Sequence, residues 1–543
     1  MVFARRSTTL LAAIIASCAM VLSLTACTSD NKTVVDGQTT VTSNSAGGVA
    51  VFTPSDGITL NQQTPLNKWA KLVPDLAKAL ADAGFKKGDI DHTTSDSLAK
   101  QSRAIQDFVV DHLSNNTTDD SGIAIAPDNM TLLVAPVVEA DASTRQYGDY
   151  VSQNLSTNDA TDGEATSDGE SSEDDSSKDD SSNTESDSTA SDEQAQAVDR
   201  LVSSLKLAKE SGMHVVLLGN SIEGYKPDAF VKFSDAQTIG KLQAEKMVSK
   251  LKLDKASKDN PKYIEVLLPY TAVDEKGNAN DSTFAQEAFR GIWQVLGSYY
   301  QKGVVESPSG TLDGKSTEND WQAVAYDAAK EGSTAKVLDK RLAKTDGQST
   351  LTRIDGIITM NDYIASEVVK ELDDLGYTGS AADINPQITI SGIVGNITGK
   401  KDLSRDAVPD PIKSPENDNA NDSSSSDDDA DKDTSASDKD RDSQWPLVTG
   451  YGAYVSNIPS IVNGKQWMTG MEDRQTIATD IAQACAKLNK DEALNSMPSI
   501  RNSEVGGVKK IPTINEPLLA VSASNLKSAL IDPGYISLAD AGL

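Results

Sequence analysis

The residue types that could carry a reaction are few in this sequence, and they are scattered. The chain has three histidines, which stand in different predicted elements: His92, His112 and His214. No two of them have the spacing that puts two ligands on one helix face, and no cysteine cluster offers a metal site. Ser97 and Lys100 form a Ser-x-x-Lys pattern that an ordinary helix surface explains as well, and Cys485 falls on an apolar helical stripe typical of a core cysteine. We therefore predict no enzymatic activity, no cofactor and no metal site.

Polar residues at the ends of predicted strands are better candidates, and for binding instead of catalysis. They follow short apolar runs at five positions: Asn220, Asp235, Asn361, Asp362 and Tyr451. In open α/β sheets, ligands bind outside the carboxyl ends of the strands. Asp235 and Asp362 have the strongest claim on this ground. Asn220 and Asn361 could equally be turn residues that end a strand. Tyr451 could equally be a residue that packs over a hinge between two parts of the chain.

Strand-like and helix-like segments alternate along the chain from residue 49. The predicted strands are Val49–Phe52, Ile58–Leu60, Leu132–Val138, His214–Leu218, Tyr263–Leu268, Gly356–Met360, Ile388–Ser391 and Leu447–Thr449. The predicted helices are Trp69–Ala83, Leu98–Leu113, Ala195–Glu210, Phe284–Leu296, Ala365–Leu375 and Arg474–Leu488. This alternation predicts the α/β class, with parallel sheets covered by helices on both faces. There are too many elements for one sheet of usual size, so we expect two lobes.

The order of these segments resembles the type I periplasmic sugar-binding proteins, nearest to the xylose- and ribose-binding kind. The matching segments lie within residues 49–520, outside two acidic stretches: Lys68–Trp69, Asp96–Val110, Leu133–Pro136, Gly212–Leu218, Phe230–Gly240, Asp355–Asp362, Val448–Ala453 and Ile461–Gln466. The resemblance implies two Rossmann-like lobes joined by a hinge that the chain crosses three times. We expect the crossings near Tyr225–Phe230, Gln466–Asp473 and Asn502–Pro512. Hinge bending would then close the lobes on a ligand.

The resemblance also implies which residues bind the ligand, and here the sequence departs from the family. The implied set is Lys68, Trp69, Asn220, Asp235, Asn361, Asp362 and Tyr451. The family's Asp-Arg, Asp-Asn and Gln-Asp pairs are replaced by Gly219-Asn220, Ser234-Asp235 and Tyr451-Gly452, and only Asn361-Asp362 is kept. Lost carboxylates and a lost arginine remove charge-assisted hydrogen bonds. The resemblance therefore supports the fold more strongly than a sugar ligand, and Trp69 fits core packing as well as ligand contact.

The first residues have the layout of a bacterial secretory signal that ends in a lipidation site. Arg5 and Arg6 precede a short apolar run, which ends in Leu24-Thr25-Ala26-Cys27. This ending resembles the bacterial lipobox, and the run is short for a membrane span. We therefore predict a signal peptide over residues 1–26, lipid on Cys27 and a flexible tether over 27–48. The protein would be anchored by lipid at the extracytoplasmic face of the cell membrane.

Most of the net charge of −31 lies in two stretches of the chain. Residues 158–196 hold fourteen acids against one lysine, and residues 416–442 hold eleven acids against three basic residues. Both stretches have almost no large apolar residue, so they cannot bury enough surface to offset the entropy of ordering. We predict disordered insertions over 155–196 and 402–444. Because nucleic acid would be repelled by this acidity, we expect no nucleic-acid partner.

These predictions combine into a domain plan and a function. The N-terminal lobe spans 49–228 and is completed by about 472–505, the C-terminal lobe spans 229–471, and residues 506–543 form a hinge crossing and tail. The predicted function is a monomeric solute-binding lipoprotein that delivers a small polar ligand, a sugar by the resemblance, to the permease of an ABC importer. Two alternatives stay open. One is a binder of a different small molecule, and the other is a ligand-free surface lipoprotein with a docking or structural role.

Overall fold

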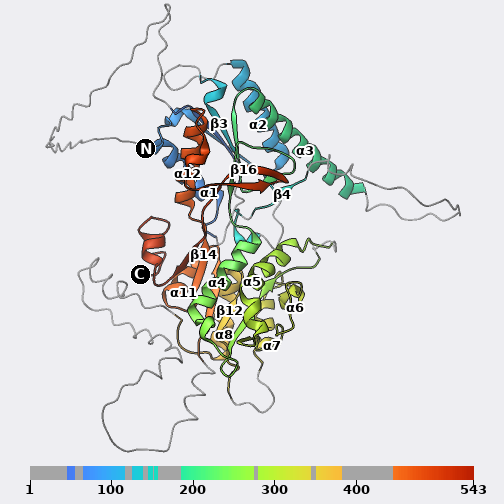
Figure 1. The fold of residues 1–543 in the computed structure, drawn as a ribbon, viewed down its shortest axis with the longest axis vertical. Helices are drawn as coiled ribbons and strands as arrows, with labels where there is room; N and C mark the ends of the chain where they lie inside the picture. Colours follow the sequence, from blue (N-terminus) through green and yellow to red (C-terminus); the bar gives the residue numbers. More distant parts are fainter. Residues whose placement is uncertain are drawn as a thin grey trace, which may run out of the picture. The chain divides into compact units, whose positions relative to one another are not determined.

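The first lobe is built on a seven-stranded sheet whose strands come from both halves of the chain. In this computed structural model, residues 46–55, 65–115, 125–138, 145–150, 152–156, 185–273, 279–343, 350–381 and 444–543 are described. The strand order is β15 (Ile500–Val505), β16 (Val508–Asn515), β7 (Ala229–Lys232), β5 (His214–Leu218), β3 (Met130–Val134), β1 (Gly48–Pro54) and β2 (Ile90–Ser95). Figure 1 labels β3 and β16 of this sheet. All neighbours are parallel except β15 and β16, which form an antiparallel hairpin.

Both faces of this sheet are covered by helices, as its central apolar strands β1, β3 and β5 require. Alternate residues of β1 point to opposite faces, so Val49 and Val51 join one core cluster while Ala50 and Phe52 join another. Helices α1 (Trp69–Asp82) and α12 (Arg474–Leu488) supply the first cluster. Helices α2 (Leu98–Asn115) and α3 (Glu185–Glu210) supply the second. The α12 helix thus completes this lobe, and it carries Cys485 fully buried, as predicted.

Helix α3 corrects one prediction about the first acidic insertion. The helix begins at Glu185, ten residues before the predicted start at Ala195 and inside the stretch 155–196 that was predicted to be disordered. Extending an existing helix adds one hydrogen bond for each residue fixed and needs no new nucleus. The turns from Ala197 onward pack in the second core cluster, so the helix can extend from them toward its N-terminus.

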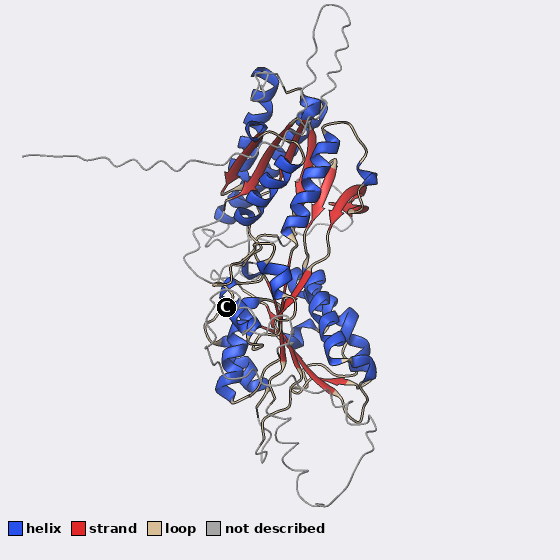
Figure 2. Cartoon of the chain, turned by 90° about the vertical axis from the view of Figure 1, so that its left-hand side faces the viewer, coloured by secondary structure: helices blue, strands red, loops and turns tan. Residues whose placement is uncertain are grey.

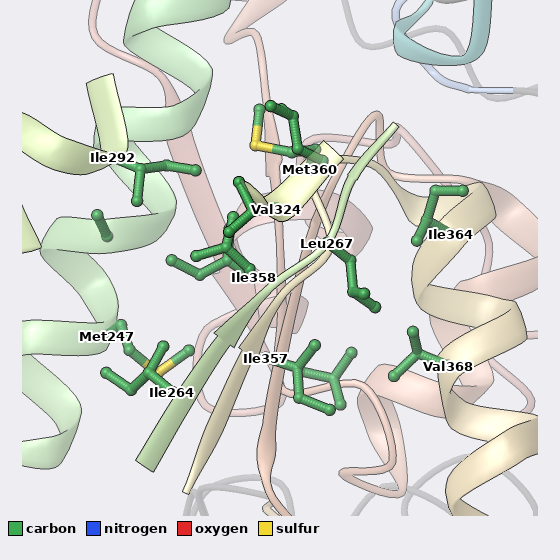
Figure 3. Close-up of a cluster of buried hydrophobic side chains, with 14 of the residues drawn as sticks. Met247, Ile264, Leu267, Ile292, Val324, Ile357, Ile358, Met360, Ile364 and Val368 are labelled. Atoms are coloured by element: carbon green, nitrogen blue, oxygen red, sulfur yellow. The ribbon is translucent and has the colours of Figure 1, made fainter. Parts of the chain in front are cut away.

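The second lobe is built on a six-stranded sheet with the same layering. Its order is β10 (Val305–Glu306), β8 (Lys262–Val266), β12 (Gly356–Ile358), β13 (Leu447–Tyr451), β14 (Met468–Met471) and β17 (Leu519–Ser522). Only β17 is antiparallel to its neighbour. Figure 2 shows helices against the strands of each sheet. Figure 3 shows strand residues such as Ile357 between Met247 and Ile292 on one side and Ile364 and Val368 on the other.

The helices that supply these outer side chains are α4 (Ala236–Leu251), α5 (Thr283–Gln301) and α8 (Asp362–Leu375). The sequence analysis predicted α5 and α8 but did not predict α4. The remaining short elements are β4 (Asn154–Leu155), β6 (Ser221–Ile222), β9 (Leu268–Pro269), β11 (Ala325–Tyr326), α6 (Trp321–Val324), α7 (Ser333–Arg341) and α11 (Ile458–Val462).

Helices α4 and α5 are held unusually close by a glycine from each. A Cβ on Gly240 would lie 2.2 Å from the carbonyl oxygen of Ala288, and one on Gly291 would lie 2.0 Å from that of Gln237. Since backbone atoms cannot yield to a methyl group, we expect Gly291→Ala to push the helices apart and to lower the free energy of unfolding by about 1–3 kcal/mol. Urea denaturation measures this change. Ser298→Ala, at an exposed position of α5, serves as the control and should change it little.

The chain passes between the two sheets three times among the described residues. It leaves β7 through Phe233–Asp235 to α4, leaves β14 through Glu472–Asp473 to α12, and leaves β16 through Glu516–Leu518 to β17. The second crossing lies within the predicted range. The first and third lie later than predicted, because β7 and the β15–β16 hairpin pair with the first sheet and prolong it.

Several predictions fall on residues outside the described ranges. They are the signal peptide, the lipid site Cys27, most of the tether over 27–48, the strands Ile58–Leu60 and Ile388–Ser391, and nearly all of the insertion 402–444. Within the described ranges, none of the helices combines the length and the apolar character needed to cross a membrane.

Candidate functional site

The first-lobe residues implied by the family resemblance contact different parts of the connection that follows β3. The Nζ atom of Lys68 lies 2.8 Å from Oδ1 of Asp149, and the Trp69 amide donates to Oδ2 of the same carboxylate at 3.0 Å. After β5, the side chain of Asn220 donates to the carbonyl of Pro136 at 2.9 Å and accepts from the Gln153 amide at 3.0 Å. These polar groups, at the start of α1 and after β5, therefore have hydrogen-bond partners within the chain itself.

Second-lobe residues contact the same connection from their own strand ends. Asn361, which follows β12, donates from Nδ2 to the side-chain oxygen of Gln146 at 3.1 Å. Tyr454, which follows β13, donates from its hydroxyl to the backbone carbonyl of Gln146 at 2.6 Å. Residues of both lobes thus contact Gln146–Tyr150, which we name the inner segment.

Two tyrosines of the inner segment fill this place with aromatic surface. Tyr147 is buried, with its ring centroid 4.7 Å from that of Phe284 and 6.2 Å from that of Tyr451. Tyr150 is also buried and packs on Trp69 at 5.1 Å and on Phe233 at 4.7 Å. Each tyrosine therefore belongs to the core of a different lobe.

Asp235 and Asp362 lie just after strands as predicted, but their hydrogen bonds are made with residues outside the inner segment. Asp235 caps α4 by accepting from the Thr238 amide at 2.7 Å, and Lys232 lies 2.9 Å from its other oxygen. Burial opposes ionisation of this carboxyl, but the hydrogen bonds from Thr238 and the charge of Lys232 lower its pKa. Asp235 is therefore an ionised helix cap.

Asp362 is fully buried inside the second lobe. Its carboxylate accepts from the Tyr454 amide at 2.9 Å, from Gln466 Nε2 at 2.7 Å and from the Thr469 hydroxyl at 2.9 Å. Burial raises its pKa to about 6, although these donors act in the opposite direction. The carboxylate therefore fixes the backbone that presents Tyr454, and all of its recorded partners belong to its own lobe.

Tyr451 lies where two of the crossings meet. Its hydroxyl contacts the Ser234 hydroxyl at 2.5 Å, and that hydroxyl donates in turn to the carboxylate of Glu472. The Ser234 amide donates to the same carboxylate oxygen at 2.6 Å. Burial raises the pKa of Glu472 to about 7 and that of Tyr451 well above its ordinary value. Ser234 belongs to the first crossing and Glu472 to the second, so this contact ties the two crossings together.

The other reactive-looking side chains of the sequence have structural surroundings. Lys100 places its amine 2.7 Å from Asp96, and only its backbone amide reaches the Ser97 hydroxyl, at 3.3 Å. Burial raises the pKa of the Cys485 thiol, which keeps it protonated and unreactive. These contacts agree with the interpretation of both positions as ordinary helix residues.

The sequence analysis missed the inner segment and Glu472. The segment stands in a polar stretch, where the pattern Tyr147-Gly148-Asp149-Tyr150 is the one local sign of packing. Gly148 has a φ of +94°, and a Cβ there would lie 2.5 Å from the carbonyl oxygen of Asn67. A glycine between two tyrosines could thus have indicated a close backbone approach. Nothing local marks Glu472, since its role depends on a contact with Ser234, which is far away in the chain.

No family model and no curated protein sequence matches the chain. Solved structures do resemble it. One is an ABC transporter solute-binding protein from Clostridium phytofermentans with bound β-D-glucose, with 17% identity, coverage of 91% of this chain and 99% of that chain, and a TM-score of 0.45. A sugar ABC transporter protein from Actinomyces odontolyticus has 10% identity, coverage of 89% and 97%, and a TM-score of 0.44. A carbohydrate transporter solute-binding protein from Chloroflexus aurantiacus in complex with D-glucose has 18% identity, coverage of 92% and 98%, and a TM-score of 0.43.

Proposed function

We propose that this protein is an extracytoplasmic solute-binding protein of an ABC importer, which binds a small polar molecule, a sugar in the first instance, between its two lobes. The observation that carries the proposal is the convergence of strand ends from both sheets on one place. Phe233 follows β7 of the first sheet and packs on Tyr150, and Asn361 follows β12 of the second sheet and donates to Gln146, so both contact the inner segment. Ligands of open α/β sheets bind at this edge.

The residues at this place suit a polar ligand with an apolar face. Lys68, Asn220 and Asn361 offer a cation and two amides, and Trp69 offers an aromatic wall. A few placed polar groups within an aromatic lining are typical of small-molecule sites. We assign solute contact to these four residues. Asp235, Asp362 and Tyr451 position the strand ends around them.

Closure of the lobes would let the importer distinguish the solute-bound protein from the empty one. Three crossings allow the lobes to move as bodies, and a solute that contacts both lobes favours the closed form through its differential contacts. The permease of the importer would recognise that closed form. We extend the proposal to a lipid on Cys27 as the anchor that keeps the protein at the membrane.

A binding screen tests this function. Monosaccharides (D-glucose, D-ribose, L-arabinose), myo-inositol and, as a second class, nucleosides are added to the full-length protein, and thermal shift and titration calorimetry are recorded. We expect at least one sugar to raise the melting temperature and to bind with saturation. A response to nucleosides alone would replace the sugar with another solute class.

One observation favours a second candidate function. The inner segment already occupies the place where a solute would sit, as expected of a ligand-free lipoprotein with a structural or docking role. Such a protein would bind none of the probes even after the inner segment is replaced, and this result would contradict the solute-binding proposal.

A further inference from the structure

The inner segment belongs to an unusually long connection. Residues 135–184 separate β3 from α3, whereas only Thr359–Asn361 separate β12 from α8. Connections between strands and helices in α/β units are usually about 2–6 residues long, and longer ones are commonly functional. This long connection starts at a strand end, at the same edge of the sheet as the predicted solute site.

Part of the connection is anchored on the first lobe. Strand β4 pairs in parallel with β6, so that Asn154 aligns with Ser221 and Leu155 with Ile222. The Ser221 amide donates to the Gln153 carbonyl at 3.0 Å, and the Glu223 amide donates to the Leu155 carbonyl at 2.8 Å. The inner segment therefore stays near the site even when its own contacts break, which gives it a high effective concentration there.

The inner segment meets the needs of the site as a ligand would. Its Asp149 carboxylate neutralises Lys68, its Gln146 side chain and carbonyl reach the second lobe, and its Tyr150 ring packs on Trp69. It therefore supplies an anion, polar atoms and an apolar face to Lys68, Trp69 and Asn361, three of the four residues assigned to solute contact. It also bridges both lobes, as the solute would do in the closed form.

We propose that Gln146–Tyr150 is an internal ligand, which occupies the solute site and must be displaced before a solute binds. This inference rests on the proposed function and adds its regulation. The solute competes with a tethered segment, so it binds only when its concentration is high enough to displace the segment. If the segment occupies the site in about 99% of molecules, the apparent Kd of the solute is raised about a hundredfold.

Gly148 offers a way to weaken the segment without altering the residues assigned to solute contact. Alanine at this position would be strained at a φ of +94° and would bring its Cβ to 2.5 Å from the carbonyl oxygen of Asn67. Gly376→Ala is the matched control, since Gly376 has a φ of +92° at the end of α8 and a Cβ there meets nothing within 4 Å. It introduces the same backbone strain away from the site.

The test measures the Kd of the sugar and nucleoside probes by titration calorimetry for wild type, Gly148→Ala and Gly376→Ala, each as the full-length protein. A fourth protein has Gln146–Tyr150 replaced by Gly-Ser-Gly-Ser-Gly, and circular dichroism checks that each variant folds. We expect Gly148→Ala to bind a probe at least about tenfold more tightly than wild type and Gly376→Ala. The replacement should bind it at least as tightly as Gly148→Ala.

The other outcomes separate the two proposals. If a probe binds wild type as tightly as both segment variants, or more tightly, the internal ligand is refuted while solute binding stands. If the replacement variant folds and no probe binds to it or to any other chain, solute binding itself is refuted. Should the replacement fail to fold, Gly148→Ala against Gly376→Ala decides alone.

Discussion

Replacing Asp362 with alanine is expected to lower the free energy of unfolding by about 3–5 kcal/mol. The carboxylate is fully buried and accepts from Tyr454, Gln466 and Thr469 at 2.7–2.9 Å. Alanine would leave these three donors buried without that acceptor, and each unsatisfied group costs about 1–3 kcal/mol.

Urea denaturation of the full-length protein measures this loss. Asp373→Ala removes an exposed carboxylate that lies 2.9 Å from Lys465 and should cost less than about 1 kcal/mol. Asp362→Asn retains the shape and one acceptor oxygen, so it should fall between the two. A loss below about 1 kcal/mol for Asp362→Ala would show that this carboxylate does not organise the strand ends of the second lobe.

The contribution of Glu472 to stability is expected to fall as the pH rises from about 5 to 8. Burial raises the pKa of Glu472 from 4.5 to about 7, so the folded protein holds a proton that the unfolded chain releases. Its contribution is complete below pH 4.5 and is lost as the pH rises through about 7. The full effect of this shift is about 3 kcal/mol. Asp362 acts in the same direction between pH 3.8 and about 6.

The variant Glu472→Gln isolates this contribution. Glutamine is uncharged at every pH and keeps an oxygen for the Ser234 amide and hydroxyl. The difference in unfolding free energy between pH 5 and pH 8 should therefore be smaller in the variant than in wild type. Other carboxylates, including Asp235 beside this site, titrate in both proteins, so their effects cancel in the comparison. Equal pH dependence in the two proteins would contradict a buried, protonated Glu472.

The architecture could be predicted from the sequence because local pattern and burial coincide in it. The strand His214–Leu218 and the helix Arg474–Leu488 have the predicted limits, since an apolar run buried on both faces and an amphipathic stripe are local properties. Helix α4 was missed, because its packing on α5 depends on glycines at two distant positions. The late crossings were missed for a similar reason: pairing of β7 and β16 with distant strands decides where a lobe ends.

The site was predictable only in outline. The placement of Asn220 and Asn361 at strand ends follows from the strand pattern, because the carboxyl ends of parallel strands lie at one edge of their sheet. The inner segment could not be placed from the sequence, because the residues before and after it are polar and its partners come from both lobes. Tyr147 packs on Tyr451 and Tyr150 packs on Trp69, and these partners stand far away in the chain, so the local sequence does not show that the two tyrosines are buried.

Hydrogen exchange tests most directly whether a solute and the inner segment compete for one place. The Asp149 amide donates to the Asn67 carbonyl at 2.8 Å, so its exchange reports whether the segment is docked. With a saturating sugar identified in the binding screen, exchange over Gln146–Tyr150 should become faster, while exchange around Trp69 and Asn361 should become slower. A sugar that binds with saturation and leaves the exchange of the inner segment unchanged or slower would contradict the account.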